Sequence, residues 1–311
     1  MFSRIPDEIR QGNLVLSPSS ITTYIKSPAK FEWQYVLGNK PEQTPAMFEG
    51  EVIHKAILEA DSFDQAFVVL EDKANFLNTI EEFKQEITNL GHKPVKGLRQ
   101  DLIDQLLALN PEARVWDVYF KALTASSERR IISPSQYKTC LDIQNKVARH
   151  SWLSKALQGG AAEQWAHYEF SKGIYLNMRM DYYNAAHKQP IVLDIKTTRS
   201  ASFEGLQKEI WNQQMYVSAA IYCDAVEKLT GKTPLFAWVV IEKEAPYPVE
   251  VYSADFGLLE AGRAVYRKTI GKICDSLNNN DFSYNQNKII NMNLPAWAFN
   301  KLDAYAESEI E

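Results

Sequence analysis

The sequence predicts a mixed α/β fold, in which helices flank a central mixed sheet and further helices are added on the N-terminal side. Three observations predict it. Three successive runs rich in β-branched and aromatic residues, 165–170, 175–184 and 190–198, indicate an antiparallel meander. Helical periodicity over 204–229 then leads to a continuous apolar run of strand length, 235–241. The chain before the meander carries helix signals.

Capping residues mark the helices that precede the meander. Ser17 followed by Pro18 is typical of a helix start and predicts a short helix. The segment 48–58 is also predicted to be helical, and it places Gly50 and His54 one turn apart on the same face.

The composition is that of an ordinary globular protein: of 311 residues, 45% are hydrophobic, 23% charged and 12% aromatic. Disordered and fibrous classes are excluded. No run approaches ~18 consecutive apolar residues, and the first residues lack an apolar signal segment, so we expect a cytoplasmic protein without a membrane partner. A net charge of −5 argues against coating nucleic acid with an overall basic surface, but it permits a local basic groove.

The three cysteines, Cys140, Cys223 and Cys274, are far apart in the sequence. This number and spacing indicate neither a disulfide framework nor a C-x-x-C metal site. An iron–sulfur cluster held by four cysteines is also excluded. We therefore expect buried thiols and no iron–sulfur cofactor.

The most informative segment is the strand that carries a D-x-K motif. Residues two apart in a strand point to the same side, so Asp194 and Lys196 project together. Val192 shares their face, whereas Leu193 and Ile195 pack behind. An acid and an amine are thus directed at one point. Taken alone, however, the bare motif is far more typical of a surface salt bridge at the end of a strand.

Asp181 lies on the preceding strand, where hairpin pairing brings its carboxylate near that of Asp194. Two anions side by side repel each other unless a cation lies between them. Carboxylate oxygens select Mg²⁺ or Mn²⁺. Such a site favours metal-assisted phosphodiester hydrolysis, with Lys196 orienting the nucleophile or stabilising developing negative charge.

The set of motifs resembles the PD-(D/E)xK nuclease superfamily and, more narrowly, the RecE-type nuclease domain, exodeoxyribonuclease VIII. The resemblance runs from Leu16 to Trp297, with a gap at about residues 60 to 130. The segments that carry it, besides G-x-x-x-H at Gly50 and His54, are Ala162-Glu163, Arg179-Met180-Asp181-Tyr182, Val192 to Thr198, Ala245 to Val251 and Leu294-Pro295-Ala296-Trp297.

The resemblance implies a restriction-endonuclease-like core and a single nuclease domain over 1–311. Within it we expect N-terminal helices with the G-x-x-x-H motif at 16–60, a helical insertion at 60–130, a catalytic core at 131–300 and an acidic tail at 301–311.

The resemblance also implies an activity: a 5′ to 3′ exonuclease that degrades linear double-stranded DNA from its ends with Mg²⁺ or Mn²⁺. The 3′ single strand left behind would serve recombination through a RecT-like annealing protein. A toroidal homo-oligomer and a phage or prophage origin are implied in the same way.

Position by position, the resemblance assigns catalytic roles to His54, Asp181, Asp194, Lys196 and Glu163. It assigns metal binding to His54, Asp181, Asp194 and Ile195. His54 suits either role, because imidazole titrates near neutrality and binds divalent metals.

DNA contacts are expected from Arg179, Arg199, Gln214 and Tyr222. Ser218 stands where the superfamily carries a glutamine, and Gln214, one turn earlier in the predicted helix, is the expected substitute. Further candidate phosphate contacts are Lys172, Lys208 and Lys243.

Two alternatives stay open at this stage. One metal site also serves an endonuclease or a structure-specific nuclease of the same fold. A non-catalytic DNA-binding recombination scaffold is the other, although such a protein has no need for two acids and a lysine around one cation.

Overall fold

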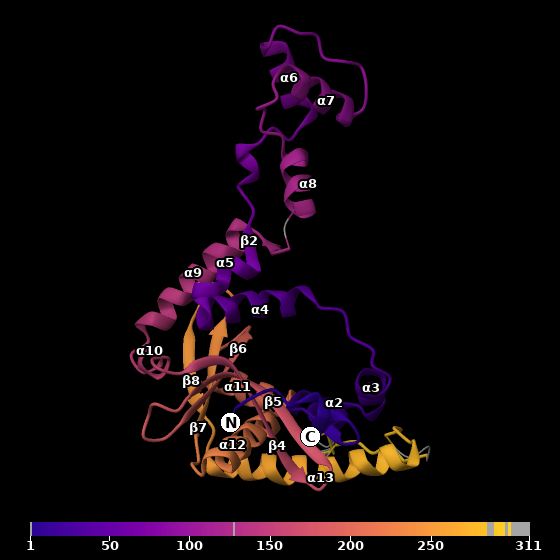
Figure 1. The fold of residues 1–311 in the computed structure, drawn as a ribbon, viewed down its shortest axis with the longest axis vertical. Helices are drawn as coiled ribbons and strands as arrows, with labels where there is room; N and C mark the ends of the chain where they lie inside the picture. The colour runs from indigo at the N-terminus through magenta and orange to yellow at the C-terminus, as the bar shows by residue number, and fades with distance from the viewer. Residues whose placement is uncertain (1, 127, 285–288, 296–297, 300–311) are drawn as a thin grey trace, which may run out of the picture.

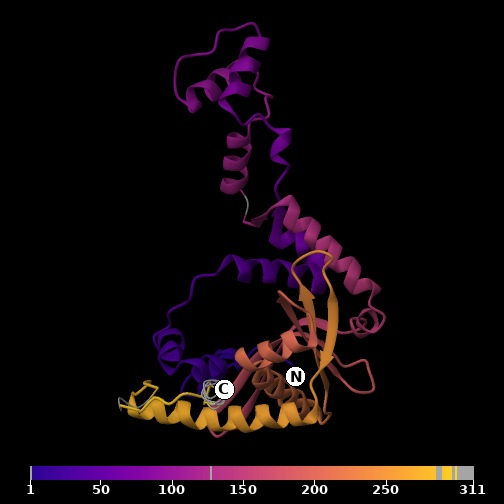
Figure 2. The ribbon, with the colours of Figure 1, turned by 180° about the vertical axis from the view of Figure 1, so that it is seen from behind.

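The computed structural model describes residues 2–126, 128–284, 289–295 and 298–299. Figures 1 and 2 show a body built around a β-sheet and an arm that projects from it. The described residues contain no helix long and apolar enough to cross a membrane. Ala296 and Trp297 of the last resembling motif, and the expected acidic tail 301–311, lie outside these residues.

The body is organised around a six-stranded mixed sheet with the strand order β1-β5-β6-β7-β8, in which β4 pairs with β5. The β4–β5, β5–β6 and β7–β8 pairs are antiparallel, whereas β1–β5 and β6–β7 are parallel. The predicted meander is therefore confirmed, and so is the mixed α/β class. The strands are β1 (Leu14–Leu16), β4 (Ala161–Ser171), β5 (Ile174–Asn184), β6 (Ile191–Thr198), β7 (Leu235–Glu242) and β8 (Val249–Ser253).

Helices cover both faces of this sheet. On one face, α2 (Pro18–Lys26), α12 (Met215–Thr230) and α13 (Phe256–Asn279) share a core with Val192 of β6. On the other, α4 (Pro45–Leu58) and α9 (Pro134–Arg149) share a core with Leu193 and Ile195. The alternation predicted for the D-x-K strand is confirmed, because its neighbouring residues enter opposite cores.

The arm contains α6 (Ile80–Asn89), α7 (Arg99–Leu109) and α8 (Trp116–Ser126), which lie far from the sheet in both views (Figures 1 and 2). A two-stranded parallel sheet of β2 (Phe67–Val69) and β3 (Arg130–Ile132) lies at its base. The arm has its own hydrophobic core, formed by Phe83, Ile87, Leu102, Ile103, Leu106 and Val115.

Short elements complete the chain: α1 (Asp7–Arg10), α3 (Pro28–Phe31), a π-helical turn (Glu32–Val36), α5 (Phe63–Ala66), α10 (Leu153–Ala156), and 3₁₀ turns at Ala60–Ser62 and Lys73–Asn75. Ser17 caps α2 as predicted, since its side chain accepts a hydrogen bond from the Ser20 amide.

The single helix predicted over 204–229 is wrong. The structure has α11 (Phe203–Asn212) and then α12, because Gln214 adopts a left-handed conformation with φ of 59°. A helix cannot pass through that conformation, so the chain changes direction between the two helices.

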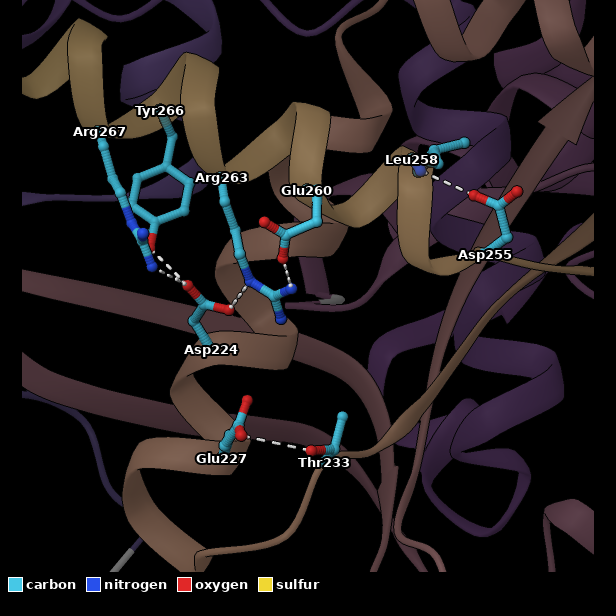
Figure 3. A network of polar contacts seen from close by, with 9 residues as sticks. All are labelled: Asp224, Glu227, Thr233, Asp255, Leu258, Glu260, Arg263, Tyr266 and Arg267. Carbon is cyan, nitrogen blue, oxygen red and sulfur yellow. Dashed lines mark hydrogen bonds and ion pairs between the residues drawn. The ribbon is translucent and has the colours of Figure 1, made fainter.

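An acid that is 12% exposed, Asp224, joins α12 to α13 (Figure 3). Asp224 accepts hydrogen bonds of 2.6 Å from Arg263 Nε and from the Tyr266 hydroxyl. The two helices also pack closely: a Cβ placed at Gly262 would lie 2.4 Å from the Tyr216 carbonyl oxygen. These contacts join α12 to α13 on the face of the sheet that includes Val192 of the D-x-K strand.

Candidate active site

The candidate site lies where β5 and β6 separate. The two strands pair over only three residue pairs, from Asn184–Ile191 to Tyr182–Leu193, whereas β6 stays paired with β7 along its whole length. Asp181 and Asp194 are the next residues beyond the last pair. The Asp181 Oδ2 atom accepts a hydrogen bond of 2.8 Å from the Ile195 amide, which takes the place of strand pairing at this fork.

Asp194 and Lys196 form a close ion pair, with 2.7 Å between Lys196 Nζ and Asp194 Oδ2. The Asp194 side chain is only 10% exposed. Burial raises the pKa of Asp194, and the Asp181 carboxylate adds to this shift, while Lys196 opposes it. Burial alone would lower the pKa of Lys196, but the Asp194 and Asp181 carboxylates raise it, so the amine is held as a cation.

Helix α4 brings His54 to the fork, where its Nδ1 atom lies 3.7 Å from Asp181 Oδ2. Gly50, one turn earlier on α4, faces β6: a Cβ at that position would lie 3.4 Å from Thr197 Oγ1, which is an ordinary van der Waals contact. The G-x-x-x-H motif therefore directs its glycine toward the strand and its histidine toward the acid.

Glu163 on β4 lies beside this group in an unusual conformation. Its φ of 53° is in the left-handed region, which costs a non-glycine residue free energy and is frequent at functional sites. Its Oε2 atom is 2.6 Å from Arg179 Nε, yet without the geometry of a hydrogen bond, and this buried oxygen has no hydrogen-bond donor. Burial raises the pKa of Glu163, while Arg179 opposes that shift.

Two cavities flank the fork. The α12 cavity has a volume of about 790 Å³ and includes Asp194 among its lining residues. The α4 cavity has a volume of about 760 Å³ and includes His54, Glu163 and Asp181. Arg179, Lys196 and Thr197 line both cavities.

The residues at the fork fit a hard divalent cation in their chemistry. Three carboxylates and an imidazole interact there, since Asp181 and His54 both perturb the pKa of Asp194 and Asp181 perturbs that of Glu163. The buried Glu163 Oε2 atom without a donor is the kind of oxygen that a cation satisfies. Within the described residues no three such side chains are gathered into a metal cage. Lys196 and Arg179 lie against two of the carboxylates.

Ile195, expected among the metal ligands, has its side chain in the apolar core and is 1% exposed. A hydrocarbon side chain cannot bind a cation, so only the backbone of Ile195 can contribute. Its amide already positions Asp181.

The expected DNA contacts fall into two groups. Arg179, Tyr222 and Ser218 line the α12 cavity, and the Tyr222 hydroxyl donates to the Arg179 carbonyl at 3.4 Å. Gln214 does not line either cavity, because its side chain bonds to the Trp211 carbonyl and the Tyr216 hydroxyl. Four other expected phosphate contacts line neither cavity. Arg199, Lys172 and Lys208 are exposed to solvent, and Lys243 forms an ion pair with Glu49.

Sequence patterns missed several residues of the site. Ser17, which caps α2, and Ser19 and Thr22 within α2 line the α12 cavity together with Trp165 and Asn177. Lys55 and Glu59, one turn apart on α4, line the α4 cavity. Ser17 and Ser19 belong to a helix-capping pattern that the sequence shows. Lys55 and Glu59 have the i, i+4 spacing of an ion pair on a helix. Nothing in the sequence indicates that either faces the D-x-K strand.

Comparison with known proteins identifies a family and a fold. A family described as "PDDEXK-like domain of unknown function (DUF3799)" matches residues 17–289. A crystal structure described as "Putative exonuclease" from Eubacterium rectale aligns over 96% of this chain and 98% of its own, with 11% identity and a TM-score of 0.54. A second structure, SSO0001, aligns over 50% of this chain and 68% of its own, with 17% identity, and its TM-score of 0.27 is too low to indicate a shared fold. No curated protein shows significant sequence similarity.

Proposed function

We propose, because the chain belongs to the PDDEXK-like family DUF3799, that it is a metal-dependent deoxyribonuclease whose site is the fork between β5 and β6. The observation that carries the proposal is the meeting of Asp181, Asp194 and Lys196 at that fork, with a cavity on either side. A structural salt bridge needs neither the second acid nor the cavities.

Each residue has a role that follows from its position. Asp181 and Asp194, with Glu163 and His54, would hold Mg²⁺ or Mn²⁺, which when bound lowers the pKa of a water and neutralises phosphate charge. Lys196 stays cationic because two carboxylates raise its pKa, so it orients the nucleophile or stabilises charge on the phosphodiester. The Ile195 amide fixes the Asp181 carboxylate, and α4 brings His54 Nδ1 to 3.7 Å from Asp181 Oδ2.

The activity we propose is 5′ to 3′ degradation of linear double-stranded DNA, which leaves a 3′ single strand for an annealing partner in recombination. The RecE-type resemblance of the motifs supports it, and so does the likeness in fold to the protein described as "Putative exonuclease". A ring-shaped homo-oligomer belongs to the same proposal, as does the choice of Mg²⁺ as the ion.

One assay tests the direction and the substrate together. Linear duplex labelled at the 5′ or the 3′ end, and closed circular duplex, are incubated with the protein and Mg²⁺. We expect early release of the 5′ label, late release of the 3′ label and intact circles. Cutting of the circles would replace the exonuclease by an endonuclease of the same fold. Binding without any cutting, at every divalent metal tested, would leave only a DNA-binding scaffold.

A further inference from the structure

Arg179 lies between the two cavities and is held there by contacts that a cation could replace. Its Nε atom is 2.6 Å from Glu163 Oε2, on the α4 side of the fork. The guanidinium carbon lies 5.7 Å from the centre of the Trp165 ring, which lines the α12 cavity. With 55% of its side chain exposed, Arg179 has room to move.

The contact with Glu163 is electrostatic and imperfect. The buried Oε2 atom gains a positive neighbour without gaining a hydrogen bond. The strong form of an arginine–carboxylate pair has two parallel N–H···O bonds, and this contact lacks them. Arg130 and Glu51, at the edge of the same cavity, are joined in that way, since both terminal nitrogens of Arg130 bond to the two Glu51 oxygens.

We propose that Arg179 is a displaceable counter-ion: it neutralises Glu163 while the fork is free of metal, and a divalent cation at the fork releases it into the α12 cavity to bind a DNA phosphate. This inference rests on the proposed function, since it takes DNA as the ligand. It requires no movement of the backbone, because Arg179 already lines both cavities. The consequence is that metal binding and DNA binding are coupled through one side chain.

The test measures binding of a fluorescent duplex oligonucleotide in chelator and in Ca²⁺, with intact strands verified on a gel. In chelator, Glu163→Gln frees Arg179 from the start, so we expect this variant to bind DNA about tenfold tighter than the parent protein, the size of one charge-assisted hydrogen bond. Arg179→Met should abolish the gain when it is combined with Glu163→Gln.

The control for overall charge is Asp142→Asn, which removes one negative charge from α9 and lines neither cavity. We expect its affinity in chelator to stay within about twofold of the parent value, because a charge far from the bound DNA is screened by salt. An equal gain in Asp142→Asn, or a gain that persists in the Glu163→Gln/Arg179→Met double variant, would overturn the inference.

A second measurement does not depend on DNA or on the folding of the Glu163 variant. Titration with Ca²⁺ alone should change the tryptophan emission of the parent protein, because Arg179 leaves the Trp165 ring. The change should be absent in Trp165→Phe and in Arg179→Met, and an unaltered change in both would contradict the displacement. Cleavage of DNA by the parent protein with Mg²⁺ is scored separately, so a failure of the nuclease proposal is distinguishable from a failure of this one.

Discussion

The arm and the body of this molecule bury their side chains in different ways. The body packs two cores against the two faces of one sheet, and its helices α12 and α13 are joined by Asp224. The arm buries its own cluster around Phe83, with no residue of the main sheet in it. Three residues at the base of the arm, Ala66, Phe67 and Arg130, line the α4 cavity. Because the arm core contains no residue of the fork, we expect the arm to fold independently of the fork.

The largest expected effect is in the body. Asp224→Ala leaves Arg263, which is 12% exposed, without its buried partner, and removes the acceptor of the Tyr266 hydroxyl. We expect a loss of about 3–5 kcal/mol in the free energy of unfolding, measured by urea denaturation. Asp275→Ala on the exposed side of α13 is the control, and an equal small loss in both would show that the Asp224 network does not hold the two helices together.

The local part of this body could be predicted from sequence, and the long-range part could not. Period-two alternation placed Val192 opposite Leu193 and Ile195, because which face a strand residue takes is a local property. The separation of β5 from β6 depends on β1 pairing with β5 from a distant part of the chain, and three residues such as Leu14–Leu16 give too weak a signal for a strand.

The candidate site divides in the same way. The D-x-K and G-x-x-x-H motifs were visible because each is held in one element. The left-handed conformations of Glu163 and Gln214 were not, since neither residue is glycine and tertiary contacts impose the φ value. The left-handed conformation of Gln214 ends the helical spacing from which its position beside Tyr222 was predicted. Glu163, in the same conformation, contacts Arg179.

The second effect is confined to the arm. Phe83→Ala removes a fully buried ring from the arm core, and we expect that core to lose about 3–5 kcal/mol. Hydrogen exchange should accelerate in α6 and α7 and stay unchanged in β5, β6 and α12, while the rate of DNA cleavage remains within about twofold of the parent value, as for a site with independent packing. Faster exchange throughout the sheet would show that arm and body fold as one unit.

The smallest effect concerns the base of the arm, where Arg130 and Glu51 are paired but largely solvent-exposed. Arg130→Met should cost at most about 1 kcal/mol. The hydrogen bond from Arg130 lowers the pKa of Glu51 in the folded protein, so its contribution is present above the ordinary pKa of 4.5 and is lost as the pH falls through the lowered value. The melting temperatures at pH 7 and pH 3 should therefore differ by less in Arg130→Met than in the parent. An equal difference would show that the Arg130–Glu51 pair does not contribute to stability.

We propose that the fork cuts phosphodiester bonds through Asp181, Asp194 and Lys196. The direct measurement is the single-turnover rate of linear duplex cleavage with Mg²⁺ for Asp194→Asn, with Asp142→Asn, outside both cavities, as the control for charge. We expect the rate of Asp194→Asn to fall by about a thousandfold while the variant remains folded, and the rate of Asp142→Asn to match that of the parent. A folded Asp194→Asn variant that cuts as fast as the parent would show that the fork is not the nuclease site.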